Sequence, residues 1–158
     1  MIQITRHSGI YTLEAETVLP ISLDRAWDYF SSPKNLAEIT PPHMGFQITS
    51  KLHDRAFSGQ IISYNVAVLP GIRTNWVTEI THVEDHQFFV DEQRFGPYSM
   101  WHHEHHFKEV PEGVHMIDRV SFKIPLWFLG DIAYGLFIKK QLKGIFEYRE
   151  RKLKELFG

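Results

Sequence analysis

The sequence predicts an α+β fold in which a curved, seven-stranded antiparallel sheet wraps around a long C-terminal helix. Two observations lead to this prediction. Apolar residues recur with a period of two through most of the chain, and with a helical period from about residue 131 onward. Turn residues interrupt the strand region at roughly every 10–15 positions, which indicates short connections between consecutive antiparallel strands.

The first strand and two short helices precede the main run of strands. Residues 10–19 alternate imperfectly between apolar and polar and end at a proline, which predicts a strand. Ser22 is a suitable N-cap for a short helix over residues 23–31. A second short helix over residues 33–39 begins with a proline, whose missing N–H is harmless in a first turn.

Six further strands and the long helix complete the chain. The six strands are expected at 46–53, 59–69, 72–84, 87–95, 98–110 and 114–124. A loop follows, and then a helix over residues 131–156. Its apolar stripe contains Ile138, Leu142, Ile145, Phe146, Leu153 and Leu156. Its basic side chains, expected on the solvated face, are Lys139, Lys140, Lys143, Arg149, Arg151, Lys152 and Lys154.

Composition and charge narrow the class of protein. The 158 residues fit one domain, 1–158, and include no cysteine, which excludes disulfides, thiolate catalysis and cysteine-ligated zinc. The formal charge of −2 and the lack of a basic tail argue against a nucleic-acid partner. The N-terminal residues do not match a secretory signal. We therefore expect a cytoplasmic protein, either a monomer or a homodimer.

Several local patterns match a known superfamily over essentially the whole chain. They are Phe30-x-x-Pro33-x-Asn35-Leu36, Ile39-Thr40-Pro41-Pro42, Phe89-Val90-Asp91-x-Gln93-x-x-Gly96-Pro97-Tyr98, Trp101-x-His103-x-His105-x-Phe107, Asp118-x-Val120 with Pro125, and Ile145-Phe146-x-Tyr148-Arg149. With them, the chain resembles the Bet v 1-like or START-like helix-grip superfamily of lipid-transfer proteins, plant hormone-binding proteins and polyketide cyclases/dehydratases. Within it, the patterns are similar to a bacterial group of ligand-binding SRPBCC proteins. The resemblance implies an apolar cavity for small hydrophobic or lipid-like ligands, but no catalytic set, because this fold hosts carriers, sensors and enzymes.

A histidine-rich strand is the main candidate for chemistry. One of its faces, marked as inward by the aromatic ends, carries Trp101, His103, His105 and Phe107. The other face, expected to be solvated, carries His102, Glu104 and His106. A hairpin turning at residues 111–113 places Asp118 near His105. The favoured interpretation is a buried polar pair that orients a ligand or satisfies the core, and acid/base chemistry and metal binding by His103, His105 and Asp118 stay open.

Asp91 and Gln93 share one face of the preceding strand. An inward Asp91 would join the histidine cluster as a general base or hold a ligand hydroxyl. The structural alternative is an Asp91 that caps a strand edge or pairs with Arg73 or Arg94. Strand register decides between the two arrangements, and the sequence alone leaves it open.

Large apolar side chains are candidates for a cavity wall. The candidate ligand-binding residues are Tyr64, Trp76, Gln93, Tyr98, Trp101, Phe107, Phe122, Trp127, Leu142 and Phe146. The apolar stretch 124–130 is too short to cross a bilayer, so no integral membrane segment is expected. It is interpreted as a lid over the cavity, a loop packed on its own core or, less favoured, a patch for transient contact with a membrane or partner.

These features favour a binding domain for a small hydrophobic or amphipathic ligand, lipid-like or polyketide-like, between the sheet and the last helix. The alternative is an enzyme of cyclase, dehydratase or hydrolase type, in which a histidine acts as base and Asp118 or Asp91 fixes its tautomer. His103, His105, Asp118 and Asp91 are then the candidate catalytic residues. A metal-binding or regulatory interaction protein is a third, less favoured interpretation. We expect no cofactor and assign no residue to a metal.

Overall fold

The computed structural model describes residues 2–69, 71–125, 132 and 137–158. Within this part of the chain, eight strands form one antiparallel sheet in the order β1-β2-β8-β7-β6-β5-β4-β3. The strands are β1 (Ile2–His7), β2 (Ile10–Leu19), β3 (Gln47–Ile48), β4 (Gln60–Leu69), β5 (Ile72–Glu84), β6 (Phe88–Phe95), β7 (Met100–Val110) and β8 (Gly113–Lys123). The helices are α1 (Leu23–Phe30), the 3-10 turns η1 (Pro33–Asn35) and η2 (Pro42–Met44), and α3 (Lys139–Phe157).

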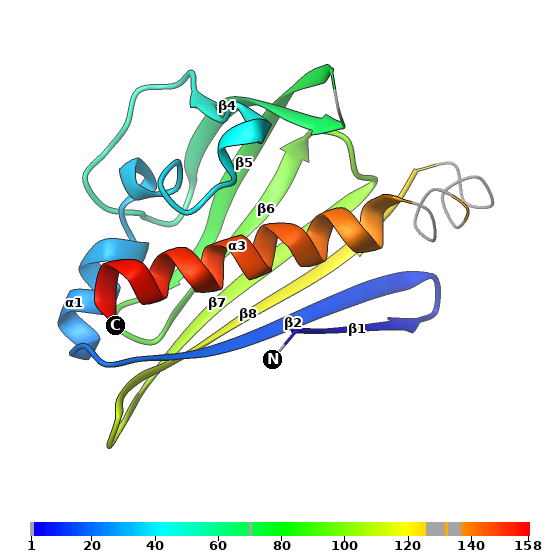
Figure 1. Ribbon diagram of the computed structural model, residues 1–158. Coiled ribbons are helices and arrows are strands. Elements are labelled where there is room, and N and C mark those ends of the chain that lie inside the picture. Colours follow the sequence, from blue (N-terminus) through cyan, green and yellow to red (C-terminus); the bar gives the residue numbers. More distant parts are fainter. Residues whose placement is uncertain (1, 70, 126–131, 133–136) are drawn as a thin grey trace.

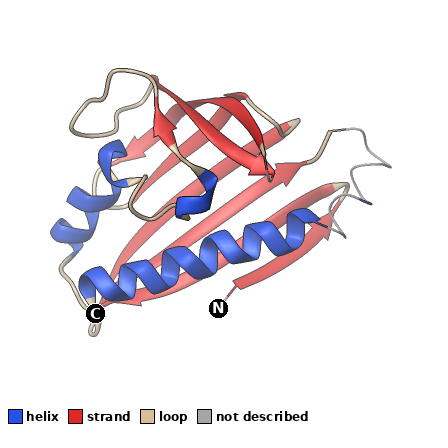
Figure 2. Ribbon diagram, turned by 45° about the horizontal axis from the view of Figure 1, so that its top comes forward, coloured by secondary structure: helices blue, strands red, loops and turns tan. Residues whose placement is uncertain are grey.

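The predicted fold class is confirmed, because the sheet curves around the C-terminal helix α3 (Figure 1). Figure 2 shows α3 lying across one face of the sheet, with the short helices beside it. None of the described helices combines the length and apolar character that a membrane span requires.

The sheet has one strand more than predicted. β1 pairs with β2 from Ile2↔Ala15 to His7↔Ile10, and a two-residue turn joins the two strands. Both turn residues, Ser8 and Gly9, have positive φ angles (51° and 78°), as two-residue hairpin turns require. Only the side chains at 2 and 4 are partly buried in β1, so its apolar alternation is too short to predict a strand.

The segment between β2 and β4 is more irregular than predicted. Helix α1 begins as expected, with Oγ of Ser22 accepting a hydrogen bond from the backbone N–H of Arg25. The helix expected over residues 33–39 is the single turn η1, because its backbone bonds span three residues, as from Leu36 N–H to the Pro33 carbonyl. The strand expected over 46–53 is reduced to the two residues of β3 that pair with β4.

Helix α3 packs toward one side of the sheet, against β1 and β2. Its C-terminal end meets α1, where the rings of Tyr29 and Phe157 lie 4.9 Å apart. Leu153 belongs to the same buried cluster as Trp27 of α1. The predicted start of this helix at residue 131 lies outside the described residues, as does most of the apolar stretch 124–130. The helix reaches β4 and β5 only through side chains, because Gln141 donates to the Val68 carbonyl and Ile145 packs against Val66 and Trp76.

Candidate functional site

A cavity of about 200 Å³ occupies the space between the sheet, α3 and the segment that carries α1, η1 and η2. Its wall is mostly apolar and aromatic. Tyr64 and Trp76 come from the neighbouring strands β4 and β5, and their rings stack at 5.9 Å. Trp101 meets Trp76 edge to face at 5.2 Å, and Tyr98 lies 4.8 Å from Trp101. These contacts hold the aromatic wall in place at one end of the cavity.

Five polar side chains form a single buried cluster beside this wall. They are Asp91 on β6, His103 and His105 on β7, Asp118 on β8, and Arg149 on α3. None of the five side chains is more than 15% exposed. Strand register brings them together: Asp91 is paired with His103, and His105 with Asp118. Because β7 lies between β6 and β8, its two inward histidines contact both carboxylates.

Asp118 is the centre of the inner part of this cluster. Its Oδ1 atom lies 3.1 Å from Nε2 of His103, with hydrogen-bond geometry. The same oxygen lies 2.9 Å from Nδ1 of His105, but the angles at this close contact are not those of a hydrogen bond. Nη1 of Arg149 approaches it at 3.4 Å. Asp118 does not line the cavity, whereas the two histidines and Arg149 do.

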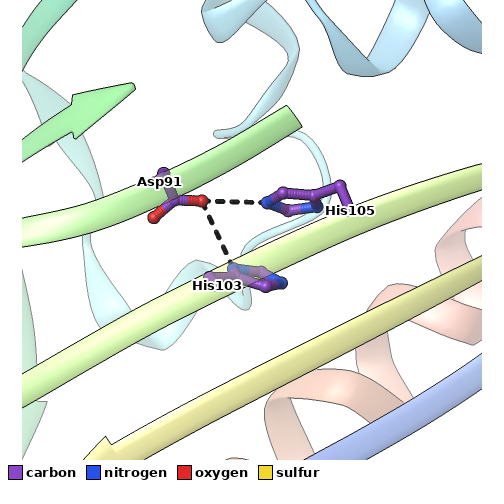
Figure 3. Close-up of side chains that lie close together, drawn as sticks. All are labelled: Asp91, His103 and His105. Atoms are coloured by element: carbon purple, nitrogen blue, oxygen red, sulfur yellow. Dashed lines mark hydrogen bonds and ion pairs between the residues drawn. The ribbon is translucent and has the colours of Figure 1, made fainter. Parts of the chain in front are cut away.

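Asp91 binds the same two histidines from the cavity side (Figure 3). Its Oδ2 atom lies 2.9 Å from Nε2 of His105, within a hydrogen bond, and 3.5 Å from Nδ1 of His103. Each imidazole therefore has one nitrogen near Asp118 and the other near Asp91.

The electrostatics of the cluster shift the pKa values of the two histidines in opposite directions. Burial, reinforced by the positive charge of His105, lowers the pKa of His103. Burial also opposes protonation of His105, but the close contact with Asp118, the hydrogen bond to Asp91 and the attraction to both carboxylates prevail and raise its pKa. Despite burial, the pKa of each carboxyl lies below its ordinary value, because the histidines and Arg149 favour the carboxylates. When His105 is protonated and His103 is neutral, the one imidazolium, the guanidinium and the two carboxylates make the cluster neutral overall.

Polar atoms without hydrogen bonds concentrate at the cavity. In the described part of the chain, five buried side-chain nitrogen or oxygen atoms have no hydrogen-bond partner. Four of them belong to residues that line the cavity: Oγ of Ser31, Nε1 of Trp76, Nδ1 of His105 and Nε of Arg149. Nδ1 of His105 already faces Asp118, so the groups left for another partner are those of Ser31, Trp76 and Arg149. Buried polar groups are normally hydrogen-bonded, so these three favour the cavity as a site for a partner with polar atoms.

Comparisons with known proteins identify the fold. No family model and no curated protein sequence matches the chain. Among solved structures, Ms6760 from Mycobacterium smegmatis has a TM-score of 0.68 at 13% identity, with 99% of each chain covered. A protein from Rhodobacter sphaeroides has a TM-score of 0.67 at 15% identity, again over 99% of each chain. Ara h 8.0201, a Bet v 1 homologue, has a TM-score of 0.59 at 16% identity over 93% of this chain and 99% of its own.

The chain has the Bet v 1-like helix-grip fold. At such low identities the likeness to these structures concerns the fold alone. The site is therefore described from the residues of this chain.

Six of the predicted ligand-binding residues line the cavity: Tyr64, Trp76, Tyr98, Trp101, Leu142 and Phe146. Three others do not. Gln93 instead braces the turn before β7, because its amide donates to the Tyr98 carbonyl at 2.6 Å and accepts from the Tyr98 N–H at 3.1 Å. Phe107 and Phe122 are buried in the core clusters, where α1 and β2 cover them. Trp127 lies outside the described residues.

The four candidate catalytic residues, His103, His105, Asp118 and Asp91, all belong to the buried cluster. Asp91 points inward, so the alternative in which it pairs with Arg73 or Arg94 is wrong: Arg94 binds Glu79, and Arg73 binds Asn65 and the Gly45 carbonyl. Chemical roles for the four residues stay predictions.

The opposite face of β7 is partly exposed rather than fully solvated. His102 lies 2.8 Å from Glu92, and His106 lies 2.7 Å from Glu104. These side chains are 24–37% exposed. The histidines of β7 therefore belong to two histidine–carboxylate groups. One group is buried at the cavity, and the other lies at the surface.

Arg149 is the functional residue that the sequence reasoning missed. It was expected on the solvated face of the helix, but its side chain is buried and contacts Asp118. The signal was its position, because Leu142, Phe146, Arg149 and Leu153 follow the i, i+4, i+7, i+11 spacing of a buried helical face. A basic residue on such a face requires a buried partner.

Proposed function

We propose that the protein binds a small hydrophobic or amphipathic molecule in the cavity, with the polar group of the ligand at the cluster of Asp91, His103, His105 and Arg149. One observation carries the proposal: two residues that line an apolar, aromatic cavity have buried donors without a partner, Nε1 of Trp76 and Nε of Arg149. A ligand oxygen that accepts from these donors would remove the cost of leaving them unpaired.

The cavity also limits the class of ligand. An apolar cavity of about 150 Å³ holds benzene, so a space of about 200 Å³ fits a somewhat larger molecule such as a small bicyclic aromatic. Both unpaired donors require an acceptor, which favours a hydroxyl, carbonyl or carboxylate oxygen on the ligand. This chemistry includes small polyketide-like aromatics and short amphiphiles.

Binding is tested by native mass spectrometry of untagged protein and by calorimetric titration with 2-naphthol, a bicyclic aromatic with one hydroxyl. Ile62 lines the cavity, whereas its neighbour Ile61 is 49% exposed. We expect Ile62→Trp to fill the cavity and abolish binding, and Ile61→Trp to leave binding unchanged. Equal binding by both variants would exclude the cavity as the site.

A second candidate function, proton-transfer catalysis of cyclase, dehydratase or hydrolase type, is favoured by the state of His103. Its lowered pKa keeps the imidazole neutral near pH 7, while Asp118 holds its Nε2 atom. A neutral imidazole with a fixed tautomer is suited to act as a general base. Turnover of polyketide-like or ester substrates that His103→Gln abolishes and His102→Gln preserves would support this function. Activity that survives His103→Gln would contradict it.

A further inference from the structure

Three side chains of the buried cluster place potential metal ligands close together. Asp91, His103 and His105 each offer one ligand atom, and the three atoms lie within 4.8 Å of one another. Oδ2 of Asp91 lies 2.9 Å from Nε2 of His105 and 3.5 Å from Nδ1 of His103 (Figure 3). Ligand atoms around a tetrahedral zinc ion, at bond lengths of about 2.0–2.1 Å, are about 3.3 Å apart. Small rotations of the side chains are therefore enough to admit an ion.

A second layer of residues orients these ligands. Asp118 contacts the nitrogen of each ring that faces away from Asp91: Nε2 of His103 at 3.1 Å and Nδ1 of His105 at 2.9 Å. Histidines that bind metals usually donate their other ring N–H to such a carboxylate, which leaves the ligating nitrogen unprotonated. Arg149 in turn contacts Asp118 at 3.4 Å and supplies a compensating charge.

The two layers also differ in their position relative to the cavity. Asp91, His103 and His105 line it, whereas Asp118 lies behind the histidines. An ion held by the first three residues would have open coordination positions toward the cavity. Such an arrangement, with three protein ligands and an open position, is typical of sites where a metal binds a further ligand.

We propose that Asp91, His103 and His105 bind one divalent transition-metal ion, with Asp118 and Arg149 orienting and neutralising the site. Two imidazoles and one carboxylate suit zinc or ferrous iron. With neutral imidazoles, the two carboxylates and Arg149 carry a net charge of −1, and a divalent ion changes it to +1. The metal would therefore favour a cavity ligand with an anionic oxygen. This arrangement differs from the metal interpretation of the sequence, in which Asp118 was the third ligand.

Equilibrium dialysis of untagged protein against zinc, followed by elemental analysis, tests the proposal without any organic ligand. We expect one zinc ion per chain, and at least 100-fold weaker binding in Asp91→Asn and in His105→Gln. Asp118→Asn keeps the three ligands but loses their support, so a decrease of about 10–100-fold is expected. The matched control is the double variant His102→Gln/His106→Gln, which removes the surface histidines of the same strand and should still bind one ion.

A zinc content far below one ion per chain in the wild-type protein would overturn the proposal. So would zinc binding that the surface double variant loses, or that Asp91→Asn and His105→Gln keep.

Circular dichroism shows whether each variant is folded. If a cluster variant does not fold, the visible absorption of the cobalt-loaded wild-type protein decides whether the metal site exists. A cobalt spectrum that differs from that of the aqueous ion and that the surface double variant retains supports the site, and a spectrum identical to that of the aqueous ion contradicts it. Failure of 2-naphthol binding would leave the zinc result unaffected. The ligand-binding proposal and the metal proposal can therefore be contradicted independently.

Discussion

At the scale of single residues, Arg149 determines whether the polar cluster can exist inside the protein. Asp91 and Asp118 are both buried, and burial alone would favour their protonated forms. The guanidinium 3.4 Å from Asp118 supplies a permanent positive charge, while its position over the rings of Phe30 and Phe146 keeps the side chain in an aromatic setting. Removing one member of a buried ion pair leaves the other charge uncompensated, which is more costly than removing both.

Arg149→Met should therefore destabilise the fold by about 3–5 kcal/mol, measured by urea denaturation at pH 7. The double variant Asp118→Asn/Arg149→Met should lose less than Arg149→Met alone, because no buried charge is left unpaired at that point. Arg151→Met, on the exposed side of the same helix, should change stability by no more than about 0.5 kcal/mol. Equal losses at 149 and 151 would contradict the buried pair.

The pKa values of the two buried histidines should lie on opposite sides of about 6.5, the ordinary value for histidine. Because its folded-state pKa is raised, His105 stabilises the fold below about pH 6.5, and this contribution is lost as the pH rises through the raised value. His103, with a lowered pKa, opposes folding when the pH falls below about 6.5, because the unfolded chain binds the proton more readily. Nitrogen-15 NMR of the rings measures both, and Asp91→Asn should lower the pKa of His105. Two histidines titrating together near pH 6.5 would contradict this assignment.

At the scale of elements, helix α3 combines a buried face with an exposed glycine. The buried face includes Leu142, Phe146 and Leu153. Gly144 lies on the exposed side, and a Cβ atom added there would have no heavy atom within 4 Å. Glycine in a helix interior costs stability because the unfolded chain has more conformational freedom to lose.

Gly144→Ala should therefore raise the free energy of unfolding by about 0.5–1 kcal/mol. Gly113→Ala is the contrasting change. Gly113 has a φ of +132°, and its added Cβ would lie 2.1 Å from the Leu19 carbonyl oxygen, so this substitution must destabilise the β7–β8 hairpin. Urea denaturation measures both variants. A destabilised Gly144→Ala would mean that this part of the helix is not packed as described.

At the scale of the whole molecule, the sheet is covered unevenly. Helix α3 packs near β1 and β2, and the cavity lies between it and much of β4 and β5. The central strands β2 and β8 pair along most of their length with neighbours on both sides, and β7 pairs with β8 over its whole length and with β6 over residues 102–106, whereas β3 pairs over only two residues at the edge. Local stability depends on such pairing and cover, so the two halves of the sheet should open at different free energies.

Hydrogen–deuterium exchange should therefore be slowest in β2, β7 and β8 and fastest in β3. Saturation with a cavity ligand such as 2-naphthol should slow exchange mainly in β4, β5 and α3, because these elements surround the cavity. Strands β2 and β8 contribute no residue to the cavity wall, so they serve as the internal control and should change little. Protection gained mainly in β1 and β2 would place the ligand outside the cavity.

Much of the candidate site could be predicted because its determinants are local. Alternation along β7 places His103 and His105 on one face, and the short hairpin turn sets Asp118 opposite His105. Asp91 could not be placed in the same way. The β5–β6 ladder shifts register between Ile80 and His82, and such irregularities have no clear signal in the sequence.

The sequence by itself determined the fold class, the main strands and the inward position of the two histidines, because hydrophobic periodicity and turn residues act over short distances. Only the tertiary structure decided that Asp91 meets these histidines, that Arg149 meets Asp118, that Phe107 and Phe122 belong to the core, and that a cavity lies between α3 and much of β4 and β5. These features depend on how a helix distant in sequence is placed over a curved sheet. Side-chain contacts between distant segments set that placement, and no local pattern records them.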